Sequence, residues 1–355
     1  VLLLFTFLFL LGLFFSFSST SSVIAEKMNK QTYFFFIKHL IFVSFSLFFL
    51  ILISIQDKNK LMKFLPLFFI ISILFLCLVP LFGVEVKGSK RWLDFPFFPR
   101  FQPIELVKPL FILFIAKIIV IEEKKNIYSR YLYSFFLLIF IITLLITQPD
   151  FGQSLLLILS WITMIFVSGF NMIILSVLGL MFLSIIILLI FIFPDKFGYI
   201  FLRIKTFIDP KAGDNFQSQK ALDAIKQGGL TGQGMGEGIL KDKVPEAHTD
   251  YIIAVISEEF GVILVLFILF LFLFIGYKAL NKVFSEQDEF IKLAVVGLIS
   301  LLIIQTFIHI GVNIRLLPTT GMTLPFLSYG GSSLIGSSII AGAILNLTRK
   351  DASRY

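Results

Sequence analysis

The sequence predicts an all-α, polytopic integral membrane protein with about ten transmembrane helices and one large extracytoplasmic loop. Of its 355 residues, 58% are hydrophobic, whereas a soluble globular protein has roughly 45–50% apolar residues. The mean hydropathy is +0.98. The apolar residues form long uninterrupted blocks, and about 20 mostly apolar residues cross a bilayer as one helix. Strands of a membrane barrel are shorter, roughly ten residues, and alternate in polarity. The blocks therefore favour helices.

Each apolar block is expected to form one span of a single membrane domain, 1–355, without a separate soluble domain. The first block lacks the charged start and the Ala-x-Ala-like cleavage site of a signal peptide, so it is interpreted as a span. Gln148-Pro149-Asp150 divides one long run into two spans that turn back on each other. The expected spans are 1–17, 33–55, 61–83, 103–121, 131–148, 151–168, 171–194, 251–276, 291–315 and 324–347.

Basic residues predict the orientation of these spans. An even number of spans places both termini on one side, together with Lys58, Lys60, Lys124, Lys125, Arg130, Lys278, Lys282, Arg349 and Lys350. Short loops rich in Lys and Arg stay in the cytoplasm, so both termini are expected there. This placement also accounts for the net charge of +8 without a nucleic-acid partner. Lys87, Lys90, Arg91 and Arg100 fall on the opposite side, where positive charge against the usual bias favours an anionic ligand.

Residues 195–250 form the one long polar stretch, the expected extracytoplasmic loop. It contains eight Lys or Arg and eight Asp or Glu residues, so it is not a polybasic tail. Phe216, Leu222 and Ile225 have near-helical spacing, which predicts a short helix on the membrane surface. Six glycines between residues 228 and 238 allow tight turns. Loops of this length are usually functional or disordered.

The strongest candidate for chemistry is the segment 245–250, PEAHTD, directly before an expected span. Ionisable groups at the mouth of a span usually face a polar cavity. Helix capping by Thr249 or Asp250 is an equally weighted alternative. The one histidine of this segment, His248, lacks the partners of a zinc site. An oxygen-ligated Mg²⁺ or Mn²⁺ at Asp250 with Glu246 stays open.

A second group of charged residues lies around the spans that begin near 103 and 151. Glu105 and Lys108 are three residues apart and share a helix face, so they line a cavity or form a structural ion pair between spans. Arg91 is interpreted as a phosphate ligand or an interfacial anchor. Asp150 is a carboxylate between two spans, and a turn cap is its ordinary alternative.

The segment 317–333 combines proline, glycine and hydroxyl side chains, including Ser328. This composition favours broken helix geometry that lines a cavity, although small residues also serve close helix packing. The sequence contains no P-loop, GxGxxG, GxSxG or HExxH motif, so nucleotide-driven and serine-hydrolase chemistry lack support and no organic cofactor is expected.

Five of these segments, in this order, resemble the SEDS family (shape, elongation, division and sporulation proteins). They are KRWL at 90–93, FQPxExxK at 101–108, QPDxG at 148–152, PEAHTD at 245–250 and PFLSYGGSS at 325–333. The FtsW branch is favoured over the RodA branch by KALDAI at 220–225 leading to GMGEG at 234–238. Three positions depart from the family pattern: Ile104 replaces a usual Ser, Thr320 a Lys of some members, and His39 a frequent Gln.

The resemblance implies a peptidoglycan glycosyltransferase that polymerises lipid II at the outer face of the bacterial cytoplasmic membrane, at the division septum. It also implies a class B penicillin-binding transpeptidase of the FtsI type and other divisome membrane proteins as partners. Asp250 matches the family's essential carboxylate, and Glu105, Lys108 and Asp150 match polar residues of its cavity. Three alternatives stay open: a lipid II flippase, a non-catalytic divisome scaffold and a RodA-type elongation polymerase.

A mechanism for such polymerisation assigns roles to these side chains. The 4-hydroxyl of an acceptor sugar attacks the anomeric carbon of a donor linked to polyprenyl pyrophosphate, and Asp250 is the expected general base. Arg91, Lys108 and Arg203 are candidates to balance the pyrophosphate charge, with or without a divalent cation. His248 and Ser328 complete the expected cavity.

Overall fold

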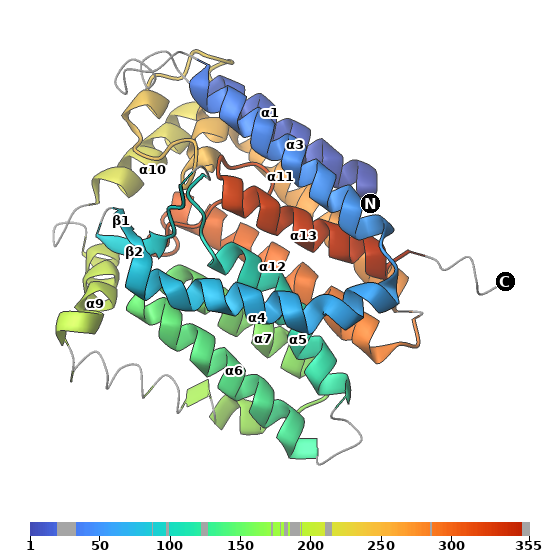
Figure 1. Ribbon diagram of the computed structural model, residues 1–355. Coiled ribbons are helices and arrows are strands. Elements are labelled where there is room, and N and C mark those ends of the chain that lie inside the picture. Colours follow the sequence, from blue (N-terminus) through green and yellow to red (C-terminus); the bar gives the residue numbers. More distant parts are fainter. Residues whose placement is uncertain are drawn as a thin grey trace.

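The apolar blocks fold into a bundle of long helices in the computed structural model (Figure 1). The structure describes residues 1–19, 33–86, 88–96, 99–121, 127–171, 173–177, 179–180, 184, 192, 194–209, 215–284 and 286–349. The helices are α1 (Leu2–Ser19), α3 (Phe34–Ile55), α4 (Lys58–Phe82), α5 (Ile104–Ile121), α6 (Ile127–Thr147), α7 (Phe151–Val167), α9 (Pro194–Ile208), α10 (Phe216–Gly228), α11 (Ile252–Val283), α12 (Glu289–Asn313) and α13 (Gly331–Leu347), with a 3-10 turn at Lys241–Lys243 and strands β1 (Val84–Val86) and β2 (Ser89–Trp92).

Five described helices are long and apolar enough to cross a membrane: α3, α4, α6, α11 and α12. Helices α1, α7 and α13 are shorter but equally apolar in character. The chain is therefore a multi-pass membrane protein, as predicted. The expected span 171–194 falls largely outside the described residues, so the count of ten spans stays a prediction.

The bundle has a loop-bearing end and an end that carries both chain termini (Figure 1). Helices α12 and α13 lie in the middle, with α1 and α3 along one side and α4 and α6 along the other. The antiparallel hairpin β1–β2, α9 and α10 gather at the loop-bearing end. The polar segments singled out in the sequence consequently lie together.

The last expected span begins later than predicted. Residues 325–329 form turns, and α13 starts at Gly331 rather than near residue 324. Phe326 has a left-handed φ of 66°, which an α-helix does not accept, and Pro325 precedes it. The tightly packed side chains of this segment, Phe326 among them, are buried. Apolar composition alone does not distinguish such a buried loop from a helix.

Helix α11 is interrupted at Gly261, whose φ is 81°. The interruption frees two backbone amides, and Val262 and Ile263 donate instead to the carbonyls of Gly229 (3.0 Å) and Leu230 (3.3 Å). A β-carbon at Gly261 would lie 2.1 Å from the Leu230 oxygen. The glycine-rich loop therefore docks on the kink because residue 261 has no side chain.

Replacing Gly261 by Ala is expected to lower the thermal unfolding midpoint in detergent micelles. A left-handed alanine costs roughly 1–2 kcal/mol, and the clash with Leu230 adds to this. Gly198→Ala is the matched control, because Gly198 is helical and a β-carbon there meets nothing within 4 Å, so its midpoint should stay or rise. Equal midpoints for both variants would contradict the docking role of the kink.

Candidate functional site

Segments far apart in the sequence meet beside Asp250 at the loop-bearing end of the bundle. A β-carbon built at Gly321 would lie 3.6 Å from Nη1 of Arg91 and 3.6 Å from Oδ2 of Asp250. Nη1 of Arg91 also lies 3.6 Å from Oδ1 of Asp150. The Arg91 guanidinium is therefore close to both carboxylates, and Gly321 lies next to both Arg91 and Asp250.

The hairpin β1–β2 places Arg91, whose side chain is only 11% exposed. Its Nε donates to the Gln148 carbonyl at 3.3 Å, and its Nη2 donates to the Pro149 carbonyl. Pro149 has an unusual φ of 27°. Arg91 therefore fastens the hairpin to the turn between α6 and α7.

Asp150 occupies the N-cap position of α7, but its side chain makes no capping hydrogen bond. Its Oδ2 accepts from Nε2 of Gln102 at 3.3 Å. Its Oδ1 is buried, and within the described part of the chain it has no hydrogen-bond partner. Burial raises the pKa of Asp150, and the Arg91 guanidinium opposes that rise. The carboxyl group thus lies between the amide of Gln102 and the guanidinium of Arg91.

Asp250 lies just before α11, which begins at Ile252 with Tyr251 at its N-cap and no side-chain capping bond. The structure thus assigns the N-cap position to Tyr251, and capping of this helix by the side chain of Thr249 or Asp250 stays an untested alternative. Nδ2 of Asn313 donates to the Asp250 carbonyl at 3.1 Å. Oδ1 of the same amide accepts from the backbone of Ala254 at 3.2 Å. Asn313 is fully buried, so this clamp holds the backbone of Asp250 while its side chain is partly exposed.

The loop before α13 braces the same segment from the other side. Oγ of Ser328 donates to the Thr249 carbonyl at 2.7 Å, and the Tyr329 amide donates to the His248 carbonyl at 2.9 Å. The His248 ring lies 5.6 Å from the Tyr329 ring and 5.3 Å from the Phe35 ring. Ser328 and His248 thus support the backbone next to Asp250, and their predicted contact with a ligand stays a prediction.

Glu105 and Lys108 form a buried network across three helices. Their side chains meet at 2.9 Å and are 5% and 2% exposed. Nε2 of Gln153 donates to Glu105 at 2.9 Å, and Nζ of Lys108 donates to Oε1 of Gln305 at 3.3 Å. The ion pair lies within α5, and the hydrogen bonds to Gln153 and Gln305 join it to α7 and α12. A contact of Lys108 with substrate stays a prediction.

Two further carboxylates hold the glycine-rich loop in place. Oε1 and Oε2 of Glu258 accept from the amides of Leu240 and Lys241, both at 2.7 Å. Glu259 pairs with Nζ of Lys241 and accepts from the Ser18 hydroxyl of α1. Both carboxylates are buried. Their role in the described structure is to anchor the segment that leads to Asp250.

We expect Glu258→Gln to loosen this loop, because one of its two acceptors becomes an amide donor that faces a backbone N–H. Leaving a buried donor unpaired costs about 1–3 kcal/mol. Trypsin should cleave after Lys241 or Lys243 several times faster than in the parent protein. Glu289→Gln is the control, since Glu289 forms only an exposed pair with Lys292 and such pairs contribute little. Unchanged cleavage in Glu258→Gln would contradict the anchoring role.

Sequence reasoning missed Asn313 and Arg315 as parts of this end of the bundle. Asn313 is a buried polar residue at the end of an apolar helix, which is itself a functional signal. Arg315 follows it with a left-handed φ of 56°, a feature that no residue pattern discloses. The predicted Arg203 lies on α9, where its Nη1 donates to the Thr319 carbonyl at 3.1 Å.

The expected cation site has a limited set of ligands. Among the described residues, no group of three or more His, Cys, Asp or Glu side chains is placed to hold a metal. Oε2 of Glu246 accepts from the Thr249 hydroxyl at 2.8 Å. One or two carboxylates together with substrate phosphate are the usual ligands of Mg²⁺. Asp250 and Glu246 are too few for a complete protein cage, and a cation that binds there with a phosphorylated substrate stays a prediction.

Comparison with known proteins agrees with this architecture. A relative from Caulobacter vibrioides, "Probable peptidoglycan glycosyltransferase FtsW", is 31% identical over 345 residues, covering 97% of this chain and 87% of the relative. A chain from a structure described as "Structural coordination of polymerization and crosslinking by a peptidoglycan synthase complex" matches with a TM-score of 0.75 at 22% identity, covering 97% of this chain and 96% of that one. Rod shape determining protein RodA from Thermus thermophilus has the same fold, with a TM-score of 0.68 and 22% identity over 98% of this chain and 94% of its own.

The family model that matches covers almost the whole chain. It is the FtsW/RodA/SpoVE model, described as "Cell cycle protein", and it matches residues 1–353. This range includes every segment that meets beside Asp250. The chain belongs to the FtsW/RodA/SpoVE family of cell cycle proteins.

Proposed function

We propose that this protein is a peptidoglycan glycosyltransferase of the FtsW type, which polymerises lipid II into glycan strands at the outer face of the bacterial cytoplasmic membrane. The observation that carries the proposal is the position of Asp250. Its carboxylate lies at the loop-bearing end of a membrane bundle, beside Arg91 and the bare backbone of Gly321. A base and a cation so arranged suit the transfer of a sugar from a pyrophosphate.

Asp250 takes the proton from the acceptor sugar's 4-hydroxyl as that oxygen attacks the anomeric carbon of the donor. General base catalysis of this kind contributes about 10²–10⁴ in rate. The bond to polyprenyl pyrophosphate breaks, and the leaving group carries away the electron pair. The proposal relies on Arg91 as the cation beside Asp250. Fixed positive charge near the leaving group stabilises the negative charge that the leaving group gains. The pyrophosphate linkage supplies the driving force, so no nucleotide site is needed.

A divalent cation, Mg²⁺ or Mn²⁺, is proposed to bind with the substrate at Asp250 and Glu246. When bound, it would neutralise pyrophosphate charge as a Lewis acid. We expect removal of divalent cations with EDTA to reduce polymerisation, and addition of Mg²⁺ or Mn²⁺ to restore it. Glu246→Gln should raise the cation concentration needed for half-maximal rate. Full activity in EDTA would exclude this cation from the reaction.

The cellular setting is proposed from the same relationship. The protein works with a class B penicillin-binding transpeptidase of the FtsI type and other divisome membrane proteins, at the division septum, with both termini in the cytoplasm. Lys58 and Arg349 support this orientation, because Nζ of Lys58 donates to the Arg349 carbonyl at the end of the bundle that bears the termini. A RodA-type role in elongation would instead place a fluorescent fusion along the lateral wall.

The test is incubation of the purified protein and its cognate transpeptidase with lipid II and a divalent cation. Glycan chains on a gel are expected. Movement of lipid II across liposomes without chains would identify a flippase, and neither activity would leave a divisome scaffold. The buried pair Glu105–Lys108 is the feature that a flippase would use on its transport path.

A further inference from the structure

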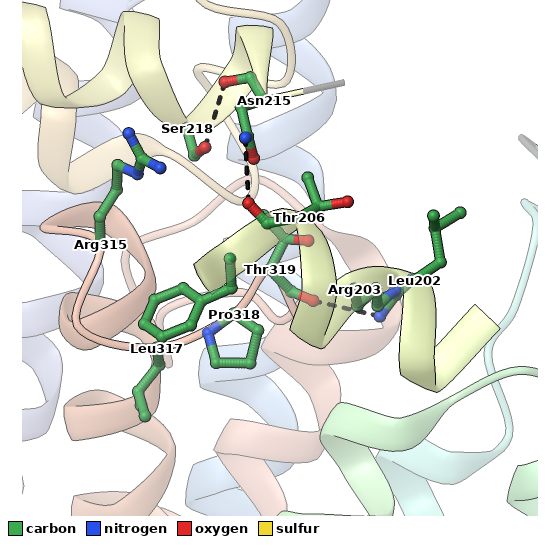
Figure 2. Close-up of a pocket in the computed structure, with 10 residues that line it drawn as sticks. Leu202, Arg203, Thr206, Asn215, Ser218, Arg315, Leu317, Pro318 and Thr319 are labelled. Carbon is green, nitrogen blue, oxygen red and sulfur yellow. Dashed lines mark hydrogen bonds between the residues drawn. The ribbon is translucent and has the colours of Figure 1, made fainter. Parts of the chain in front are cut away.

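A pocket of about 200 Å³ lies between α9, α10 and the loop that follows α12. Figure 2 shows two arginines on its rim, one from α9 and one from the loop. The side chains that matter for its chemistry are Arg203, Asn215, Ser218, Arg315, Leu317 and Pro318. Among the described residues that line it, none is an Asp or a Glu. The pocket thus combines two cations with apolar walls.

Each guanidinium group donates a hydrogen bond to a neighbouring segment of the chain. Nη1 of Arg203 donates to the Thr319 carbonyl at 3.1 Å, and Nη1 of Arg315 donates to Oε1 of Gln219 at 2.7 Å. A guanidinium carries five N–H donors in a planar fork, so it binds an oxyanion while it keeps such a contact. Two arginines directed at one pocket favour a phosphate or carboxylate ligand.

The backbone of Arg315 is held in a conformation that costs energy. Its φ of 56° lies in the left-handed region, where Gly or Asn is the ordinary residue. The Arg315 amide donates to the Val312 carbonyl at 3.1 Å, and the Leu316 amide donates to the Gly311 carbonyl at 2.7 Å. This tight turn directs the long side chain of Arg315 back toward α10. Non-glycine residues in such conformations cluster at ligand sites.

The α9 side of the pocket is amphipathic. Phe201, Leu202, Ile204 and Ile208 are 58%, 55%, 42% and 74% exposed, while Arg203 on the same helix lines the pocket. A helix with large exposed apolar residues and basic neighbours lies in the membrane interface. The pocket therefore adjoins a lipid-facing surface, which fits a ligand that joins an anionic group to an apolar chain.

The pocket is close to the proposed catalytic carboxylate. Thr319 contributes to the pocket wall, and Gly321, two residues further on, lies beside Asp250. Two residues span at most about 7 Å. A ligand held by the arginines is thus within reach of the reacting centre.

We propose that Arg203 and Arg315 hold the pyrophosphate of the polyprenyl-linked donor, with the polyprenyl chain along the exposed apolar residues of α9. This assignment rests on the proposed glycosyltransferase function. It makes Arg315 a binding residue and gives the surface helix α9 a role in receiving the lipid.

The test measures equilibrium binding of a polyprenyl pyrophosphate to the full-length protein in nanodiscs. Arg203→Gln and Arg315→Gln should each weaken binding about tenfold or more, because each removes a charge-assisted contact. Binding of the matching polyprenyl alcohol should not change. Lys205→Gln, on the same helix but outside the pocket, should bind within about twofold of the parent.

Three results would overturn the assignment. The first is an unchanged affinity for polyprenyl pyrophosphate in both arginine variants, and the second is an equal loss of affinity for the polyprenyl alcohol. The third is a loss of affinity only for an acidic stem peptide, with the affinity for polyprenyl pyrophosphate unchanged. A loss for inorganic pyrophosphate in the same variants would support it. Lipid II polymerisation is measured on the same preparations. If the parent protein makes glycan chains but the arginine variants bind pyrophosphate as well as the parent does, only the assignment of the pocket is refuted. If the parent binds through the arginines but makes no chains, only the proposed function is refuted.

Discussion

Asp250→Asn is expected to reduce lipid II polymerisation by about 10²–10⁴, the contribution of a general base. The amide has nearly the same shape as the carboxylate but takes no proton. The Asn313 clamp acts on the backbone of residue 250, so it survives the substitution. The variant should therefore keep the thermal unfolding midpoint of the parent while glycan chains disappear from the gel.

Asp94→Asn is the matched control for this experiment. Asp94 lies at the same loop-bearing end of the bundle as Asp250. Its side chain is 41% exposed and pairs with Arg100 at 3.0 Å, and it has no role in the proposed reaction. Its rate should stay within about twofold of the parent. Robust chain synthesis by Asp250→Asn would refute the assignment of the base, and loss of folding in that variant would show that residue 250 serves structure first.

Lys108→Ala should lower the free energy of unfolding by about 3–5 kcal/mol, the range for removing one partner of a buried ion pair. Glu105 would keep a charge at a site that is 5% exposed, with only the amide of Gln153 left to bind it. Denaturant unfolding in micelles measures the change. The joint replacement of Glu105 by Gln and Lys108 by Met removes both charges and should recover much of the loss.

The surface pair Glu289–Lys292 is a close control for this second experiment. It has the same three-residue spacing and the same 2.9 Å distance, but its side chains are 63% and 33% exposed. Lys292→Ala should change the free energy of unfolding by less than about 1 kcal/mol. If Lys108→Ala costs no more than Lys292→Ala, the buried network does not join α5 to α7 and α12.

Hydropathy and spacing predicted much of the fold. In the part of the chain that the structure describes, most of the apolar blocks became helices close to their expected bounds, and Glu105 with Lys108 formed the pair that a helical face predicts. The sequence pattern did not predict the two places where a helix is interrupted or begins late. The chain turns at Phe326, inside the expected last span, and α11 is interrupted at Gly261, where it binds a loop about thirty residues earlier.

The sequence by itself determined that this chain crosses a membrane and that it resembles cell-wall polymerases, and it predicted a catalytic role for Asp250. Only the tertiary structure decided that Arg91, Asp150 and Gly321 meet beside that carboxylate, and that Arg203 and Arg315 share one pocket. The physical reason is that periodicity reports which face of a helix is apolar. It carries no information on which loops, separated by many residues, come together once the helices pack.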